Sequence, residues 1–222
     1  MRAGPGRAWR APPARQECGC FKQSRTEPAG AYEGLASAPA RRCGDAVVLS
    51  AAARAGATPL RRTGRTSQAL ALLQEAHDRL TSASRPTEAE LDAAGMVELT
   101  VAYTAAQAHE AALARDFEDA ANQTTRRLVH RPYDDGHRHL LAAAQCTLYR
   151  IGIHRHLGDV DTALAHAARL DLRALPTGER RARAATDTAP LLDAGDSAGA
   201  FDQLRRSRPP RQARRVVPRC AH

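Results

Sequence analysis

Two stretches of the chain, HLGDVDTALAHAARL (156–170) and LDAGDSAGAFDQL (192–204), carry the same short motif. Gly158-Asp159 is followed by Ala163-Leu164, and 37 residues later Gly195-Asp196 is followed by Ala200-Phe201. Each motif lies between two segments with helical apolar periodicity, so it predicts the turn of a helical hairpin that recurs. A recurring hairpin in turn predicts a stack of helices that recognises a partner on its surface.

The preceding sequence predicts further helices. Apolar residues on one face predict a helix over 67–82, and Thr87-Glu88-Ala89-Glu90 has the pattern of a capping box at the start of the next helix. That helix extends to about Ala108, and another carries Ala111 to Leu128. Beyond a Pro- and Gly-containing loop at 130–136, we expect helices over 141–157, 163–170, 178–193 and 200–204, the third of them with Pro190 in its interior.

The first 60 residues differ from this pattern. Gly and Pro interrupt residues 1–44, and only a weak helix is expected from Asp45, ending at Gly56 and Pro59. We therefore expect a disordered or weakly structured basic tail at 1–60, a helical-repeat domain at 61–205 and a disordered Arg/Pro-rich tail at 206–222. With no strand-like alternation in the sequence, the fold class is all-α.

Charge is concentrated at the two ends of the chain. The formal net charge is +9, but residues 1–43 hold eight Lys or Arg against three acids, and residues 203–222 hold seven arginines and no acid. The body between them is mildly acidic, so nucleic-acid binding would act through the tails. Without an apolar run long enough for a membrane span or a secretory signal, we expect a cytoplasmic protein that does not bind membranes.

The sequence offers no pattern for catalysis, a cofactor or a metal. His109-Glu110 begins like a zinc-protease motif, but the second histidine is missing. The pairs His137/His139 and His154/His156 are spaced by two, so on a helix they point apart. The five cysteines have irregular spacing and predict no disulfide framework, and Cys146 is expected to be a buried thiol. We expect no enzyme activity, cofactor or metal.

Each hairpin resembles a tetratricopeptide-type unit, with a small residue five positions after the glycine of the turn. Ala163 and Ala200 take that position, and Ala114 takes it in a hairpin that has His109-Glu110 in place of Gly-Asp. The resemblance implies a right-handed stack of antiparallel helical hairpins, an α-solenoid, between disordered basic tails. It also implies a concave groove lined by the first helix of each hairpin, where a protein segment or small ligand would bind. Transferred to this chain, the groove positions are Tyr103, Gln107, Gln145, Arg155, His156 and Asp193.

A narrower resemblance covers residues 60–205. The strings LTVAYTAAQA (99–108), TLYRIGIHRHLGD (147–159), DLRALPTGERRARAATDTA (171–189) and LDAGDSAGAFDQL (192–204) resemble the C-terminal repeat region of actinobacterial helix-turn-helix regulators of the xenobiotic-response-element, Cro-repressor-like type. In that family the repeat region is thought to sense a ligand or partner. Residues 1–66 do not supply the helix-turn-helix, so the resemblance implies a truncated relative.

These observations lead to two hypotheses. The first is a non-enzymatic interaction module, like the sensor region of a transcriptional regulator, with a possible homodimer and only indirect contact with DNA. The alternative is a nucleic-acid-binding protein that acts without sequence preference through its basic tails.

Overall fold

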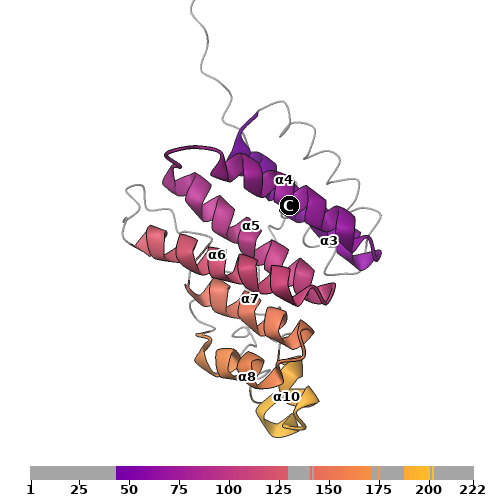
Figure 1. Cartoon of the computed structure of the whole chain (residues 1–222). Coiled ribbons are helices and arrows are strands. Elements are labelled where there is room, and N and C mark those ends of the chain that lie inside the picture. The colour runs from indigo at the N-terminus through magenta and orange to yellow at the C-terminus, as the bar shows by residue number, and fades with distance from the viewer. Residues whose placement is uncertain are drawn as a thin grey trace, which may run out of the picture. The chain divides into compact units, whose positions relative to one another are not determined.

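The computed structural model describes residues 44–129, 141, 143–171, 175, 188–200 and 202. Every regular element in these ranges is a helix, which confirms the all-α class (Figure 1). The chain divides into two compact units with the boundary between Ala142 and Ala143, and each unit is described by itself.

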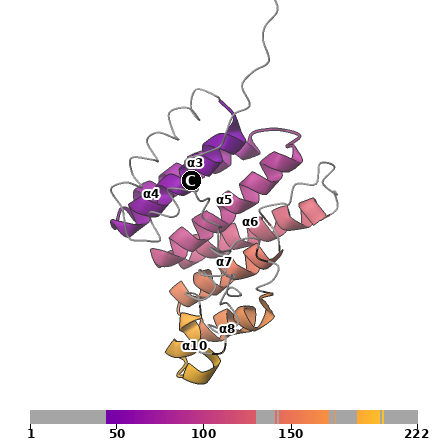
Figure 2. The same cartoon turned by 180° about the vertical axis from the view of Figure 1, so that it is seen from behind.

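In the described residues of the first unit, four helices follow one another through short links. They are α3 (Ala46–Arg62), α4 (Thr66–Thr81), α5 (Glu88–Gln107) and α6 (Ala111–Val129). Each packs against the next, and α3 also packs against α5. Figures 1 and 2 show that α3 and α4 form one antiparallel pair and α5 and α6 a second.

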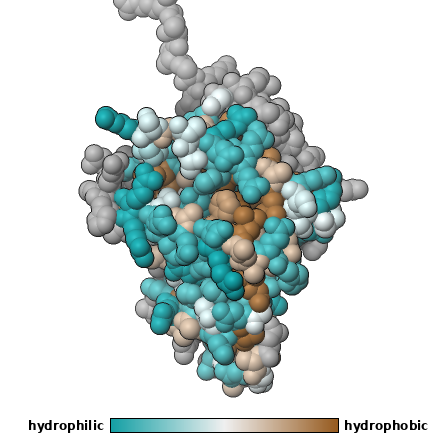
Figure 3. Space-filling view, viewed as in Figure 1, coloured by the Kyte–Doolittle hydropathy of each residue, from teal (hydrophilic) through white to brown (hydrophobic). Residues whose placement is uncertain are grey.

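Helix α5 is the centre of this unit. Every residue from Leu91 to Ala102 is buried, and Met96, Val97 and Leu99 are at most 1% exposed. A helix that is apolar on all sides is typical of an interior position, where neighbours cover more than one face. Figure 3 shows hydrophilic residues over most of the viewed face and hydrophobic ones gathered over the middle of α5.

Leu141, which lies beyond α6 in the sequence, contacts α5. The Leu141 backbone N–H donates to Oδ1 of buried Asp92 at 2.8 Å, and the Leu141 side chain lies where a Cβ on Gly95 would be. Glycine at position 95 therefore allows the close approach of Leu141. The predicted start of a helix at residue 141 is wrong by two residues, because Leu141 precedes the helix and is held by Asp92.

The second unit contains α7 (Ala143–His156), α8 (Val160–Arg169) and the short α10 (Ala189–Asp193). Helix α8 packs against both α7 and α10. Buried Leu148 and Leu175 form the centre of an apolar cluster with Ala144 and Leu170. Cys146 is a buried thiol and forms no disulfide among the described residues, and its place in a helical stretch predicted its burial.

Four helical hairpins turn in the same way. In each hairpin, the second residue after the end of the first helix has a positive φ. These residues are Gly64 (76°), His109 (61°), Gly158 (79°) and Gly195 (79°). At each turn the N–H of this residue bonds the carbonyl three residues back, and the next N–H bonds the carbonyl five residues back, with N···O distances of 2.8–3.1 Å. These two bonds define a Schellman motif, which closes a helix and reverses the chain.

An alanine follows each turn residue by five positions and is almost completely buried. Ala69, Ala114 and Ala163 are 0% exposed, and Ala200 is 1% exposed. The sequence analysis identified this alanine after three turns, and the described structure adds a fourth case, Ala69 after Gly64-Arg65. A small side chain at this position lets the second helix cross close to the first.

Most of the predicted helices are confirmed. Helices α4, α5, α6 and α8 lie within a few residues of their expected limits. The capping box is also present: Oγ1 of Thr87 accepts from the Glu90 N–H at 3.2 Å, and the Glu90 carboxylate accepts from the Thr87 N–H at 2.8 Å.

The expected limits of α3 were wrong. The helix continues through Gly56 and Pro59 to Arg62, and its packing against α4 and α5 places it inside the first unit. The expected domain boundary between residues 60 and 61 thus falls within a helix. Burial of Ala53, Gly56 and Ala57 offsets the poor helix propensity of glycine and proline.

Pro190 was also placed wrongly. It lies in the first turn of α10 and not in the interior of a long helix, and Thr188 is the residue before that helix. Proline is well tolerated there, because the first turn has no intrahelical acceptor for its missing N–H. Residues 1–43 of the expected tail 1–60, the whole expected tail 206–222, the expected loop at 130–136 and most of the expected helix 178–193 lie outside the described residues.

Candidate functional site

Two of the predicted groove residues, Tyr103 and Gln107, lie on α5 of the first unit. The half-buried Tyr103 ring faces the Arg61 guanidinium of α3, whose central carbon is 5.5 Å from the ring centroid, a cation–π distance. Arg61 also donates from Nη1 to Oγ1 of Thr104 at 3.0 Å. Tyr103 is therefore partly engaged in the packing of α3 on α5, while Gln107 is the partly exposed last residue of α5.

The other four predicted groove residues lie in the second unit. Arg155 and His156 are partly exposed in the last turn of α7, and Asp193 is the last residue of α10, with its side chain outside the described structure. Gln145 is 4% exposed, and its Oε1 has no hydrogen-bond partner among the described residues. Gln145 is therefore buried in the packing with an unsatisfied acceptor, whereas Arg155 and His156 on the same helix are partly exposed.

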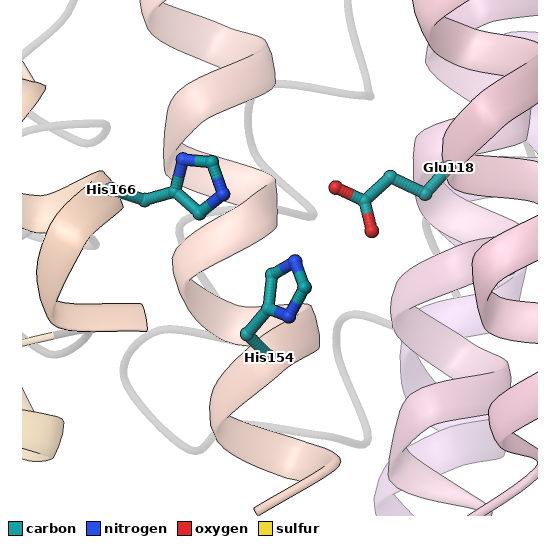
Figure 4. Close-up of side chains that lie close together, drawn as sticks. All are labelled: Glu118, His154 and His166. Atoms are coloured by element: carbon teal, nitrogen blue, oxygen red, sulfur yellow. The ribbon is translucent and has the colours of Figure 1, made fainter. Parts of the chain in front are cut away.

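A histidine pair that the sequence analysis missed joins α7 and α8. The rings of His154 and His166 are stacked, with centroids 5.4 Å apart and an interplanar angle of 29° (Figure 4). Nδ1 of His154 lies 3.4 Å from Oδ2 of Asp159 in the turn between the helices. Figure 4 also draws Glu118, which belongs to α6 of the first unit. The sequence analysis compared His154 only with His156, which points away from it on the same helix, whereas His166 approaches from the next helix.

Asp159 also caps α8. Its Oδ1 accepts from the Thr162 N–H at 3.2 Å. Hydrogen bonds from Thr162 lower the pKa of Asp159 below its ordinary value of 3.8. Burial acts in the opposite direction, and the nearby His154 lowers the pKa by a smaller amount. The turn thus keeps a carboxylate at the positive end of the α8 dipole.

A cavity of about 170 Å³ lies in the first unit. Its walls come from the end of α4, the link 82–87, the first half of α5 and the last turns of α6. Leu80, Leu91 and Ala94 provide apolar walls, while Thr124 and Glu98 provide buried polar groups that are 6% and 4% exposed.

Glu98 is the most unusual of these residues, because it is acidic and lies in the apolar part of α5. Its Oε1 is 3.2 Å from Nε2 of His77 on α4, close enough for the ring N–H to donate to the carboxylate. The edge of the Phe117 ring approaches His77, with centroids 5.4 Å apart and an interplanar angle of 73°. Glu98 is thus held from one side by His77, which is itself fixed by α6.

The second carboxylate oxygen of Glu98 is unsatisfied. Oε2 is buried and has no hydrogen-bond partner among the described residues. Leaving a buried polar group unpaired costs about 1–3 kcal/mol, and more when the group is charged. A buried acceptor without a partner is uncommon in folded proteins.

Two other acidic or basic side chains line the cavity. The Glu90 carboxylate is already engaged by the capping box with Thr87, and Arg127 is exposed in the last turn of α6. Among the described residues that line this cavity, Glu98 therefore combines deep burial with a carboxylate oxygen that has no hydrogen-bond partner in the described structure. Sequence reasoning did not find Glu98, because only the fold brings α4, α5 and α6 around it.

Comparisons with protein-family models, with curated proteins and with solved structures gave no match for this chain. In the described helices, we found none with both the length and the apolar character needed to cross a membrane.

Proposed function

We propose that this chain is a cytoplasmic, non-enzymatic interaction module built as a tetratricopeptide-like α-solenoid. The observation that carries the proposal is the recurrence of one turn: positive φ, two Schellman hydrogen bonds and a buried alanine five residues later, at Gly64, His109, Gly158 and Gly195. Unrelated helical hairpins do not require a small residue at the same position after the turn. Repeats of one supersecondary unit require it, because each unit packs its two helices in the same way.

The burial of α5 supports stacking of such units. An isolated hairpin can cover only one face of each of its helices, yet in the first unit α5 contacts α3, α4 and α6. Its long buried stretch is what an interior helix of a stack requires, since successive hairpins share a continuous core.

The first helix of each hairpin would then supply the recognition surface, with Tyr103 and Gln107 on α5 and Arg155 and His156 on α7. Tyrosine and arginine are enriched among residues that dominate binding energies, since each combines apolar area with a polar group. We propose a protein segment or a small ligand as the partner, as in the sensor region of the helix-turn-helix regulators that residues 60–205 resemble.

The proposal is tested by the binding of peptides to the purified full chain. A random dodecapeptide array identifies sequences that bind, and calorimetry with the best of them gives the affinity. We expect Tyr103→Ala to weaken binding about tenfold or more, as at other interface anchors. The control Gln68→Ala changes an exposed residue of α4 and should leave the affinity unchanged. A folded chain that binds no peptide at any measured concentration would contradict recognition of a protein segment.

The same preparation tests the alternative of nucleic-acid binding, which the Arg-rich ends of the sequence favour. A fluorescent DNA duplex is titrated at several salt concentrations. Binding through the arginines at 203–222 would fall steeply with salt, because each phosphate contact releases counterions. Duplex binding that persists at high salt would contradict a role limited to the tails.

A further inference from the structure

We propose that His154 and His166 together bind one divalent transition-metal ion in the second unit. The two imidazoles come from adjacent helices, α7 and α8, and their ring centroids are 5.4 Å apart (Figure 4). A ring nitrogen of His154 lies within 4.8 Å of a ring nitrogen of His166. Imidazole is the commonest metal ligand in proteins, and zinc, copper and nickel all bind it well.

The distance between the rings fits two ligands on one ion. A Zn–N bond is about 2.0–2.1 Å long, so two imidazoles on a tetrahedral ion have their centroids roughly 5 Å apart and their nitrogens roughly 3.3 Å apart. The observed centroid distance of 5.4 Å is close to the first of these values. Small rotations of the rings about χ2, a torsion with broad minima in histidine, would bring the two nitrogens onto the ion.

Asp159 prepares His154 for this role. Its Oδ2 lies 3.4 Å from Nδ1 of His154. A carboxylate only accepts hydrogen bonds, so it favours the tautomer with the proton on Nδ1 and the lone pair on Nε2, the nitrogen that would bind the ion. Histidines that bind metals ordinarily have a carboxylate or a carbonyl at their second nitrogen.

The backbone between the two histidines is fixed. The Asp159 N–H donates to the His154 carbonyl at 2.9 Å, and the Asp159 side chain caps α8 by accepting from the Thr162 N–H. Ligands on two helices that a closed turn joins are held near the geometry that an ion needs. The His154 side chain is 17% exposed and His166 is partly buried, so water can reach the ion and complete its coordination.

This site goes beyond the proposed groove, because neither histidine is one of the six predicted groove residues. It also differs from the expectation of no metal, which considered only histidines two residues apart on one helix. The bound ion would link α7 to α8, so metal would add to the stability of this hairpin.

The experiment follows these two rings in the full chain, because the chain contains nine histidines and total zinc uptake would not identify the site. The histidines carry ¹³C at Cε1, EDTA removes bound metal and is itself removed, and NMR follows a titration with zinc sulfate. We expect the His154 and His166 signals to shift together and to saturate at one ion per chain with one affinity. Absence of saturation, or different affinities at the two rings, would overturn the proposal. Magnesium prefers oxygen ligands and should leave both signals unchanged, whereas equal shifts with magnesium would overturn the proposal as well.

Variants then test whether the two histidines act together. In His166→Gln we expect His154 to bind zinc at least about tenfold more weakly, since even the loss of an outer partner of a ligand weakens metal binding by about 10–100-fold. His156→Gln makes the same change at a partly exposed position of α7 and should bind zinc at His154 like the unmodified chain. Unchanged affinity of His154 in His166→Gln would mean that each ring binds alone, and would overturn the proposal.

If His166→Gln does not fold, the reciprocal variant His154→Gln, followed at His166, decides the question by the same criterion. Dilution of the unmodified chain gives a further test. Affinity that is independent of chain concentration supports a site within one chain, and affinity that falls on dilution would mean that the ion joins two chains and would overturn it. Failure here leaves peptide binding at Tyr103 in the first unit untouched, so the two proposals fail separately.

Discussion

His109 has a φ of 61° at a turn whose three counterparts are glycines. The left-handed conformation costs a residue with a Cβ about 1 kcal/mol, because Cβ approaches the following carbonyl oxygen. We expect His109→Gly to raise the free energy of unfolding by up to about 1 kcal/mol, less what glycine adds to the entropy of the unfolded chain. Urea denaturation of the two chains measures the difference. A destabilised variant would mean that the exposed His109 side chain contributes more than its backbone strain costs.

The reverse substitution at Gly158 isolates the backbone effect. Its φ is 79°, and a Cβ placed there would meet no atom within 4 Å. We therefore expect Gly158→Ala to destabilise the chain by about 1 kcal/mol through backbone strain alone. The same denaturation series measures it. Equal stability of Gly158→Ala and the unmodified chain would show that the turn relaxes to another conformation.

At the scale of the elements, the stability of α5 depends on the capping box in its first turn. Two reciprocal hydrogen bonds between Thr87 and Glu90 satisfy backbone N–H groups that have no partner within the helix. We expect Thr87→Ala to lower the free energy of unfolding by about 1 kcal/mol and Thr87→Ser, which keeps the hydroxyl, to change it little. Chemical denaturation compares the three chains. Equal losses in both variants would assign the effect to the threonine methyl group and not to the cap.

The capping residue of α8, Asp159, makes the stability of the chain depend on pH. Hydrogen bonds from Thr162 lower the pKa of Asp159 in the folded chain below 3.8, so the unfolded chain binds the proton more readily. Asp159 therefore contributes stability that is complete above pH 3.8 and is lost as the pH falls through the lowered value. We expect a smaller loss of stability between about pH 6 and about pH 2.5 in Asp159→Asn than in the unmodified chain. Asp116→Asn, which changes an exposed residue of α6, is the matched control and should keep the original pH dependence.

The elements also show which parts of the structure could be predicted. The capping box and the limits of α4 to α6 depend on residues close together in the sequence, so local patterns predicted them. The full length of α3 depends on its burial against α4 and α5, and local propensity at Gly56 and Pro59 therefore gave the wrong end. The unsatisfied Glu98 and the His154–His166 pair each require contacts between helices, and no spacing within one helix contains that information.

At the scale of the whole molecule, the question is whether the four hairpins are repeats of one unit. Ala69, Ala114 and Ala163 each occupy the same place after a Schellman turn and are 0% exposed. If the hairpins are repeats, a larger side chain in place of these alanines should lower the free energy of unfolding by a similar amount in both compact units. If the alanines only reflect the alanine-rich composition, the cost will differ from one hairpin to the next.

We expect leucine at each of these three alanines to lower the free energy of unfolding by about 1–3 kcal/mol, because overpacking forces the crossing helices apart. The matched controls place leucine at exposed alanines two residues away in the same helices, Ala71, Ala112 and Ala165, where the change should stay within about 0.5 kcal/mol. Thermal and urea denaturation of the six variants measure these differences. Amide hydrogen exchange tests whether Ala163→Leu loosens α7 and α8, and whether Ala114→Leu loosens α5 and α6. A hairpin that accepts leucine at the buried alanine as readily as at its exposed neighbour is not built like the others, and the solenoid proposal would lose the observation that carries it.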